Sequence, residues 1–144
     1  RRERETYRQL LRELELGLED RMTVKVGLLS GGQRQALALL MATLKKPKVL
    51  LLDEHTAALD PKTAEKVLEI SDRLISAHHL TTLMVTHNMR DAIKHGNRLI
   101  MMHEGQIVLD INGAEKKSLT VEDLLERFGK VSGEEFANDR ALLS

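Results

Sequence analysis

The stretch LLSGGQRQALALLMATLKKPKVLLLDEHTAALDP, residues Leu28–Pro61, decides the fold of this chain. Ser30 is a favourable N-cap, and the segment after it has helical spacing to about Leu44, before Pro47 breaks the helix. Apolar side chains surround most of this predicted helix, so we expect it to be largely buried. They are Ala36, Leu37, Leu39, Leu40, Ala42 and Leu44.

A strand and a long helix are predicted after this proline. The continuous apolar run Val49–Leu52 is typical of a central parallel strand covered on both faces, and Asp53 and Glu54 follow at its C-terminal end. Pro61 suits the first turn of a helix that runs to about His78. The residues of this helix that we expect to point inward are Ala64, Val67, Leu68, Ser71, Leu74 and Ile75.

The rest of the chain continues the alternation of helices and strands. The predicted elements are a helix at 1–16 ended by Gly17, a loop at 18–29, a strand at 81–86, a helix at 89–95, and strands at 98–103 and 106–111 joined by a Glu104-Gly105 hairpin. The first helix has a predicted buried stripe of Tyr7, Leu10, Leu11 and Leu14. Two short helices are expected after residue 118, capped by Thr120 with Asp123 and by Ser132 with Glu135. This order implies an α/β fold with a mostly parallel sheet.

The composition is that of an ordinary soluble protein. The 144 residues are 42% apolar and 31% charged, enough for one packed core. Basic and acidic residues balance at 22 each, so no overall field draws the chain to nucleic acid, and we expect no nucleic-acid partner. The lack of cysteine excludes disulfides and thiolate metal sites. Without a membrane span or a signal-peptide pattern, we expect a cytosolic protein. Because Arg1 stands where Met would be, we expect a processed product, a proteolytic piece or an excerpt of a longer protein.

Two predicted strands end in residues that could carry chemistry. Asp53 and Glu54 follow one strand and His87 follows the next, and the ligand crevice of an open parallel sheet lies at the carboxyl ends of its strands. In nucleotide-hydrolysing folds, the first acid of such a pair anchors the hydration shell of magnesium and the second polarises an attacking water. The simpler interpretation is an acid that only caps the following turn.

The start of the helix after Ser30 is a candidate anion site. Two glycines, Gly31 and Gly32, let a backbone approach an anion closely, and the helix dipole favours negative charge there. Ser30 adds a hydroxyl group. Alone, this pattern is equally that of a glycine-rich loop with a serine cap.

The order and spacing of these segments together resemble the ATP-binding subunit of ABC transporters. In that family LSGGQ is the signature motif, VLLLDE the Walker B strand, AALD (57–60) the D-loop and the strand-terminal histidine the switch residue. The resemblance runs from about Arg1 to Phe128 and implies a P-loop NTPase-like fold, here incomplete. It implies part of the helical subdomain at 1–46, the second half of the RecA-like core at 47–114 and a helical tail at 115–144.

The resemblance also implies a role for each motif residue. Asp53 would organise magnesium, Glu54 would act as general base and His87 would contact the γ-phosphate of ATP. The signature residues would cover the nucleotide held by a second subunit of a head-to-tail dimer, and Asp60 would couple the two sites. The signature residues are Ser30, Gly31, Gly32 and Gln33. This arrangement requires Glu54 and His87 to share one rim of the sheet and the two glycines to be uncovered by packed side chains.

One position departs from the family, and several other residues receive structural interpretations. His55 stands where the family commonly has proline, and we interpret it as a tolerated turn variant rather than a metal ligand. His78 and His79 end a helix, and His95 and His103 are expected at the surface. The strand methionines, Met84, Met101 and Met102, are expected to fill the core.

The phosphate loop of the family is missing from the 144 residues. No G-x-x-x-x-G-K-[ST] motif occurs. The only Gly-Lys pair is Gly129-Lys130, where Val131 stands in place of the required Ser or Thr and Leu124 in place of the first glycine. A preceding strand, an adenine-stacking aromatic residue and a convincing Q-loop are absent too, since Gln9 lies too near the signature. Either the front half of an ATPase is missing or the chain is a natural half-module. The first is favoured, because Val49–Leu52 would otherwise present an unpaired apolar edge.

Three functions remain open. The leading one is the ATPase subunit of a bacterial importer, a homodimer that uses ATP and Mg²⁺ and sits with permease subunits on the inner face of the membrane. Within the family, the sequence looks most like ATPases assigned to tryptophan or tyrosine uptake. One alternative is an ABC-type ATPase of chromosome organisation or DNA repair. Such proteins place long coiled coils before the signature motif, and residues 1–16 show too little heptad pattern for one. The other alternative is a non-catalytic module that completes the ATP site of a partner.

Overall fold

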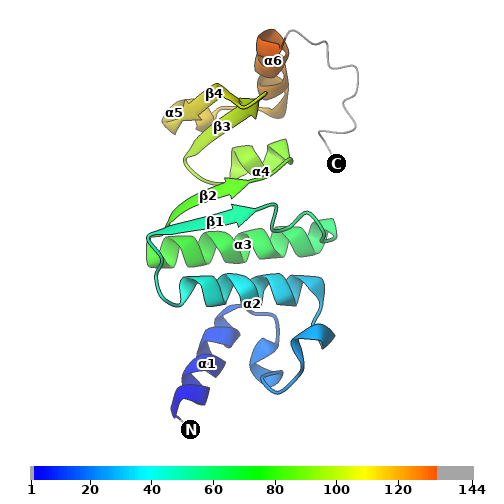
Figure 1. Ribbon diagram of the computed structural model, residues 1–144, viewed down its shortest axis with the longest axis vertical. Coiled ribbons are helices and arrows are strands. Elements are labelled where there is room, and N and C mark those ends of the chain that lie inside the picture. The colour runs from blue at the N-terminus through cyan, green and yellow to red at the C-terminus, as the bar shows by residue number, and fades with distance from the viewer. Residues whose placement is uncertain (1, 133–144) are drawn as a thin grey trace. The chain divides into compact units, whose positions relative to one another are not determined.

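The structure is a computed structural model that describes residues 2–132, and the chain divides into two compact units, Arg1–Val85 and Thr86–Ser144. The first unit contains α1 (Arg2–Glu13), the 3₁₀ helices η1 (Leu18–Asp20) and η2 (Val26–Leu28), α2 (Gly31–Thr43), β1 (Val49–Asp53), α3 (Pro61–His78) and β2 (Thr81–Val85) (Figure 1). The second contains α4 (Met89–Lys94), β3 (Arg98–His103), β4 (Gln106–Asn112), α5 (Gly113–Lys117) and α6 (Val121–Ser132). No helix among the described residues is long and apolar enough to cross a bilayer.

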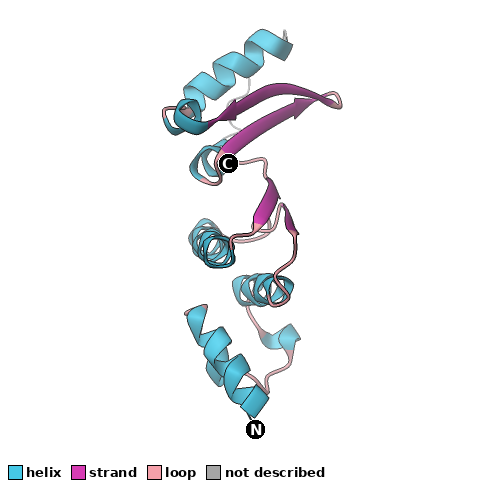
Figure 2. Ribbon diagram, turned by 90° about the vertical axis from the view of Figure 1, so that its left-hand side faces the viewer, coloured by secondary structure: helices cyan, strands magenta, loops and turns pink. Residues whose placement is uncertain are grey.

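The first unit is built on a pair of parallel strands packed against helices. β1 and β2 pair in register from Val49↔Thr81 to Asp53↔Val85, as the predicted strand-helix-strand order requires. Figure 2 shows α2 and α3 nearly end-on beside this pair. The core between them is formed by Leu14, Leu18, Leu29, Ala36, Leu39, Leu40, Leu50, Leu52, Ile70, Leu74 and Leu80.

The prediction that β1 is covered on both faces is wrong for the described residues. Leu50 and Leu52 are buried against the helices, whereas Val49 is 52% exposed and Leu51 69% exposed on the opposite face. The cause is that successive side chains of a strand point to opposite faces, and the helices pack on only one of them. A continuous apolar run therefore does not prove burial on both sides.

The predicted helices are present, with differences at their ends and faces. α3 runs from Pro61 to His78 as predicted, and Ile70 joins its buried face. α1 ends at Glu13, before the predicted stop at Gly17, and Tyr7 of its predicted stripe is 52% exposed. The predicted loop at 18–29 contains η1 and η2. In the signature helix α2, Ala36, Leu39 and Leu40 are buried, but Ala42 and Leu44 are exposed.

A close contact between α2 and α3 explains why residue 32 is glycine. A Cβ atom added to Gly32 would lie 2.3 Å from the Cγ2 atom of Thr63, closer than real Cβ contacts allow. Gly32 is accordingly buried in the first turn of α2. The absence of a side chain at this position lets the two helices approach each other.

The second unit is an antiparallel hairpin with helices packed on it. β3 and β4 pair from Arg98↔Asn112 to His103↔Gln106 with an irregularity at Met101/Met102, and Glu104 and Gly105 both have positive φ, as the predicted tight turn requires (Figure 2). Its core consists of Met89, Leu99, Ile111, Leu119 and Leu124.

Several predictions for this unit are corrected. His95 is buried at 8% exposure instead of lying at the surface, and the half-buried His103 stacks edge-on against Phe128 at 5.3 Å. Met102 is 64% exposed, although Met84 and Met101 pack against the cores as predicted.

In the tail, the capping box of Thr120 and Asp123 at the start of α6 is confirmed. α5 was not predicted. The second tail helix was predicted to be capped by Ser132 with Glu135. Ser132 lies within α6, and Glu135 falls outside the described residues.

Lys116 is a buried cation that ties α5 to the end of α4. Its side chain is 4% exposed, and its Nζ donates to the carbonyl oxygens of Ile93 and of His95, the latter at 2.9 Å. Burial lowers the pKa of the Lys116 ammonium group. The carbonyl groups at a helix C-terminus favour a cation, so Lys116 acts as a C-terminal cap for α4.

Replacing Gly32 with alanine should destabilise the first unit by about 1–3 kcal/mol, because the clash with Thr63 outweighs the better helix propensity of alanine. Urea denaturation followed by circular dichroism measures this change. The double variant Gly32→Ala/Thr63→Ser removes the clashing methyl group and should recover the stability. Gly27→Ala, where an added Cβ meets nothing within 4 Å, is the control. Equal stability of both single variants would contradict the packing role.

Replacing Lys116 with methionine should lower the unfolding free energy of the second unit by about 1–3 kcal/mol, because the buried carbonyl group of His95 and the partly buried one of Ile93 lose their donor. Lys117→Met provides a matched control, since Lys117 is exposed one position along the same helix. Faster amide hydrogen exchange in α4 of the Lys116 variant only is the expected signature. An unchanged exchange rate in α4 would show that Lys116 does not cap it.

Candidate functional site

The acidic pair lies at the carboxyl end of the parallel strands. Asp53 is the last residue of β1 and pairs with Val85, the last residue of β2. Glu54 follows directly, and its backbone N–H donates to the carbonyl oxygen of Val85 at 2.9 Å. Both acidic side chains are exposed. The sheet therefore presents two carboxylates at the edge where the ligands of parallel sheets bind.

The turn after the acids has an unusual backbone and a buried anchor. Glu54 has φ +44°, in the left-handed region that non-glycine residues rarely adopt. The next residue, His55, places its Nε2 3.0 Å from the Oγ of Ser71 on α3. His55 thus joins the turn to α3, a contact that was not predicted from the sequence. No local pattern signals this bond, because it joins residues 16 positions apart.

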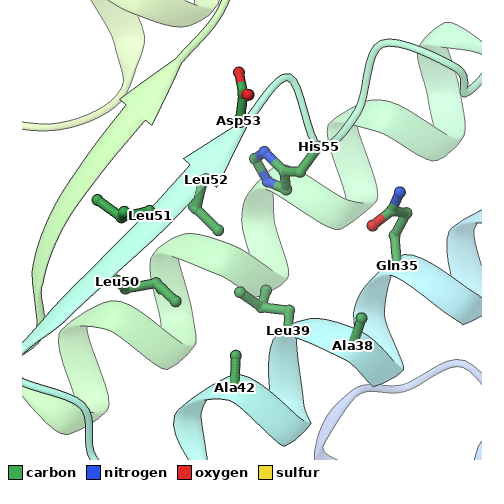
Figure 3. A pocket seen from close by; sticks show the side chains of 9 residues that line it. All are labelled: Gln35, Ala38, Leu39, Ala42, Leu50, Leu51, Leu52, Asp53 and His55. Carbon is green, nitrogen blue, oxygen red and sulfur yellow. The ribbon is translucent and has the colours of Figure 1, made fainter.

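A hollow of about 220 Å³ opens between α2 and β1, next to the acidic edge. Figure 3 shows the Asp53 carboxylate at the end of β1, the His55 ring beside the following turn, and Gln35 on α2. The other lining residues are Ala38, Leu39, Ala42, Leu50, Leu51 and Leu52. The hollow is mostly apolar, and its polar groups lie at the acidic end.

The signature residues form a capping box. Ser30 Oγ accepts from the backbone N–H of Gln33 at 3.2 Å, and the Gln33 Oε1 accepts from the N–H of Ser30 at 3.0 Å. The Gln33 Nε2 also donates to the carbonyl oxygen of Leu16 at 3.1 Å. The amide of Gln33 is therefore used within the chain, where it joins the signature helix to the segment after α1.

The two signature glycines differ in exposure. Gly31 is half-buried, with Leu59 beside it, while Gly32 is buried against Thr63 of α3. The expectation that both glycines lie uncovered is therefore wrong for Gly32. The packing of α2 on α3 requires glycine at this position. Only Ser30 and Gly31 remain accessible at the start of α2.

Asp60, predicted to lie in the D-loop, is the N-cap of α3. Its Oδ1 accepts from the backbone N–H of Thr63 at 3.1 Å. Hydrogen bonds from the Thr63 side chain and backbone hold the pKa of the Asp60 carboxyl group below its usual value. Asp60 is thus kept ionised at the start of a helix, where negative charge is favourable.

His87 belongs to the second unit and is exposed there. It precedes Asn88, the N-cap of α4, whose Oδ1 accepts from the N–H groups of Arg90 and Asp91. The chain places His87 just beyond Val85, the partner of Asp53. That His87 meets Glu54 at one rim stays a prediction.

The residues that the structure describes include no group of three or more acidic or histidine side chains that could hold a metal ion. Asp53 by itself offers one exposed carboxylate. That is compatible with Mg²⁺, which protein sites hold through one or two carboxylates while water and substrate phosphates supply the other ligands.

Comparison with known proteins shows similarity to one family. The family model described as "ABC transporter" matches residues 2–57. A tyrosine transport ATP-binding protein of Clostridioides difficile is 55% identical over 119 residues, which cover 83% of this chain and 47% of that protein.

Two further relatives have related descriptions. An aliphatic sulfonates import ATP-binding protein of Agrobacterium fabrum is 40% identical over 98 residues, 68% of this chain and 38% of that protein. An energy-coupling factor transporter ATP-binding protein of Bacillus cereus is 40% identical over 101 residues, 70% of this chain and 34% of that protein. The chain spans about half the length, or less, of these curated relatives. With its signature helix start and its acid-terminated strand, the chain belongs to the ABC transporter ATP-binding family.

Proposed function

We propose that this chain is part of the ATP-binding and ATP-hydrolysing subunit of an ABC importer, in which ATP closes a dimer of two subunits and hydrolysis reopens it. The observation that carries the proposal is the β1–β2 ladder, which places Asp53 and Glu54 at the carboxyl edge of the strands. The names of the relatives, which refer to transport and import, support the transport function over chromosome organisation or DNA repair.

The acidic edge would provide the hydrolytic groups. The carboxylate of Asp53 would hold Mg²⁺, which supplies positive charge to the phosphates of bound ATP. Glu54 would accept a proton from, and orient, the attacking water. His87 would donate a hydrogen bond to the γ-phosphate from the loop after β2. Each of these side chains is exposed, so solvent and substrate can reach it.

The signature helix start would act on the nucleotide of the second subunit. Ser30 and Gly31 lie at the accessible first turn of α2, where the helix dipole favours a phosphate. Gly32 and Gln33 would support this surface through the packing and hydrogen bonds described above. Asp60, at the start of α3, would pass changes at the dimer interface to the same helix that packs on Gly32.

The proposed partner and substrate are supported by the names of the relatives. The subunit would bind transmembrane permease subunits and so lie on the inner face of the membrane. Tyrosine or tryptophan is the proposed class of solute, supported by the 55% identity to a tyrosine transport ATP-binding protein over 119 residues. The permease rather than this subunit would select the solute.

The 144-residue chain by itself should show negligible ATP turnover, because it contains no phosphate loop to supply the backbone cradle, the lysine and the magnesium-binding hydroxyl. A protein that combines these residues with a phosphate-loop segment should hydrolyse ATP. Phosphate release measured with and without Mg²⁺ compares the two. Magnesium-dependent turnover by the 144 residues alone, lost in Glu54→Gln, would overturn this expectation.

In the protein that carries the phosphate loop, Glu54→Gln should lower kcat for ATP hydrolysis by about 10²- to 10⁴-fold, because the amide cannot accept a proton from water. ATP binding should persist. Glu69→Gln, the same change on the exposed side of α3, should leave kcat unaltered. A loss of less than about tenfold in Glu54→Gln would exclude Glu54 as the general base.

A further inference from the structure

The catalytic candidate Glu54 lies in a strained turn that must be held in place. The left-handed backbone of a non-glycine residue, here with φ +44°, persists only where surrounding contacts maintain it. One contact is the hydrogen bond from the Glu54 N–H to the carbonyl oxygen of Val85, which fixes the turn to the sheet. The Glu54 carbonyl oxygen also accepts from the Ala57 N–H at 3.0 Å, but this bond lies within the turn and does not tie it to α3.

A second contact comes from the neighbouring side chain. The Nε2 of His55 lies 3.0 Å from the Oγ of Ser71, which is 2% exposed on α3. The Ser71 hydroxyl group has one proton, and it donates to the carbonyl oxygen of Val67 at 2.8 Å. Oγ must therefore accept from His55, so the Nε2 of His55 carries a proton. The direction of the bond is thus set by the serine and its helix.

We propose that His55 is a positioning residue for Glu54. The backbone of Glu54 ties the turn to β2, and the side chain of His55 ties it to α3. Because consecutive Cα atoms are about 3.8 Å apart, a shift of the His55 backbone is expected to displace the Glu54 backbone as well. This inference rests on the proposed ATPase function and assigns a role to a residue outside the signature, Walker B and switch motifs.

The contact has features that favour positioning over a ligand-binding role. Ser71 is buried in the middle of an 18-residue helix and already bonds to its own helix, so it forms a rigid anchor. His55 is half-buried, and the described residues contain no metal-binding group to which it could contribute. The His55 side chain therefore acts on Glu54 through the backbone.

The test uses two substitutions at His55 in the protein that carries the phosphate loop. Gln can donate from an amide nitrogen placed much as Nε2 is, while Met has a similar size and no donor. His55→Met should lower kcat for ATP hydrolysis by about tenfold to a hundredfold, because a small displacement of a catalytic group is costly, and should leave the KM for ATP unchanged. His55→Gln should retain most of the turnover.

A variant at the other end of the bond gives an independent readout. Ser71→Ala should lower kcat as His55→Met does, and the double variant should be no slower than either single variant, because both remove the same contact. Hydrogen exchange should accelerate at the Glu54 amide in both. It should not change at the Ala92 amide, which donates to the Asn88 carbonyl in the other unit. If His55→Met does not fold, Ser71→Ala decides the question.

The outcomes separate this inference from the proposed function. Normal kcat in both His55→Met and Ser71→Ala, or equal losses in the Met and Gln variants, would overturn the positioning role. If Glu54→Gln abolishes turnover while His55→Met does not affect it, only the positioning role fails. If Glu54→Gln has no effect, the general-base role fails whatever His55 does.

Discussion

The parallel pairing of β1 with β2 is the interaction on which the candidate site depends. Its register ends at Asp53↔Val85, and one more backbone bond joins Glu54 to the same Val85. A shift of one residue in this pairing would move every side chain of β1 to the other face. The burial of Leu50 and Leu52 in the helical core makes such a shift costly, so hydrophobic packing on one face sets where the acids emerge.

The two faces of this strand pair differ in their environment. One face supplies Leu50 and Leu52 to the core with α2 and α3. On the other, Leu51, Leu83 and Val85 are between 46% and 69% exposed. The same apolar composition thus serves a packed face and an exposed face.

Residues of the family motifs also have structural functions within this chain. Ser30 and Gln33 form a capping box, Gly32 allows α2 to pack on α3, and Asp60 caps α3. Loss of activity after substitution at any of these positions would therefore combine a folding effect with a nucleotide effect. The side chain of Glu54 is exposed, and its backbone N–H bonds to the carbonyl oxygen of Val85.

Local patterns in the sequence determined the longer helices, the strands and several caps, but not α5, η1 or η2. Pro61 and Asp60 mark the start of α3, Ser30 the start of α2, and Glu104-Gly105 the hairpin, because each requires only neighbouring residues. The acidic strand end was likewise visible as a local pattern. Tertiary structure alone decided which face of β1 is buried, why position 32 requires glycine, and that His55 bonds to Ser71. These features depend on contacts between residues far apart in the chain, which no local spacing of residue types specifies.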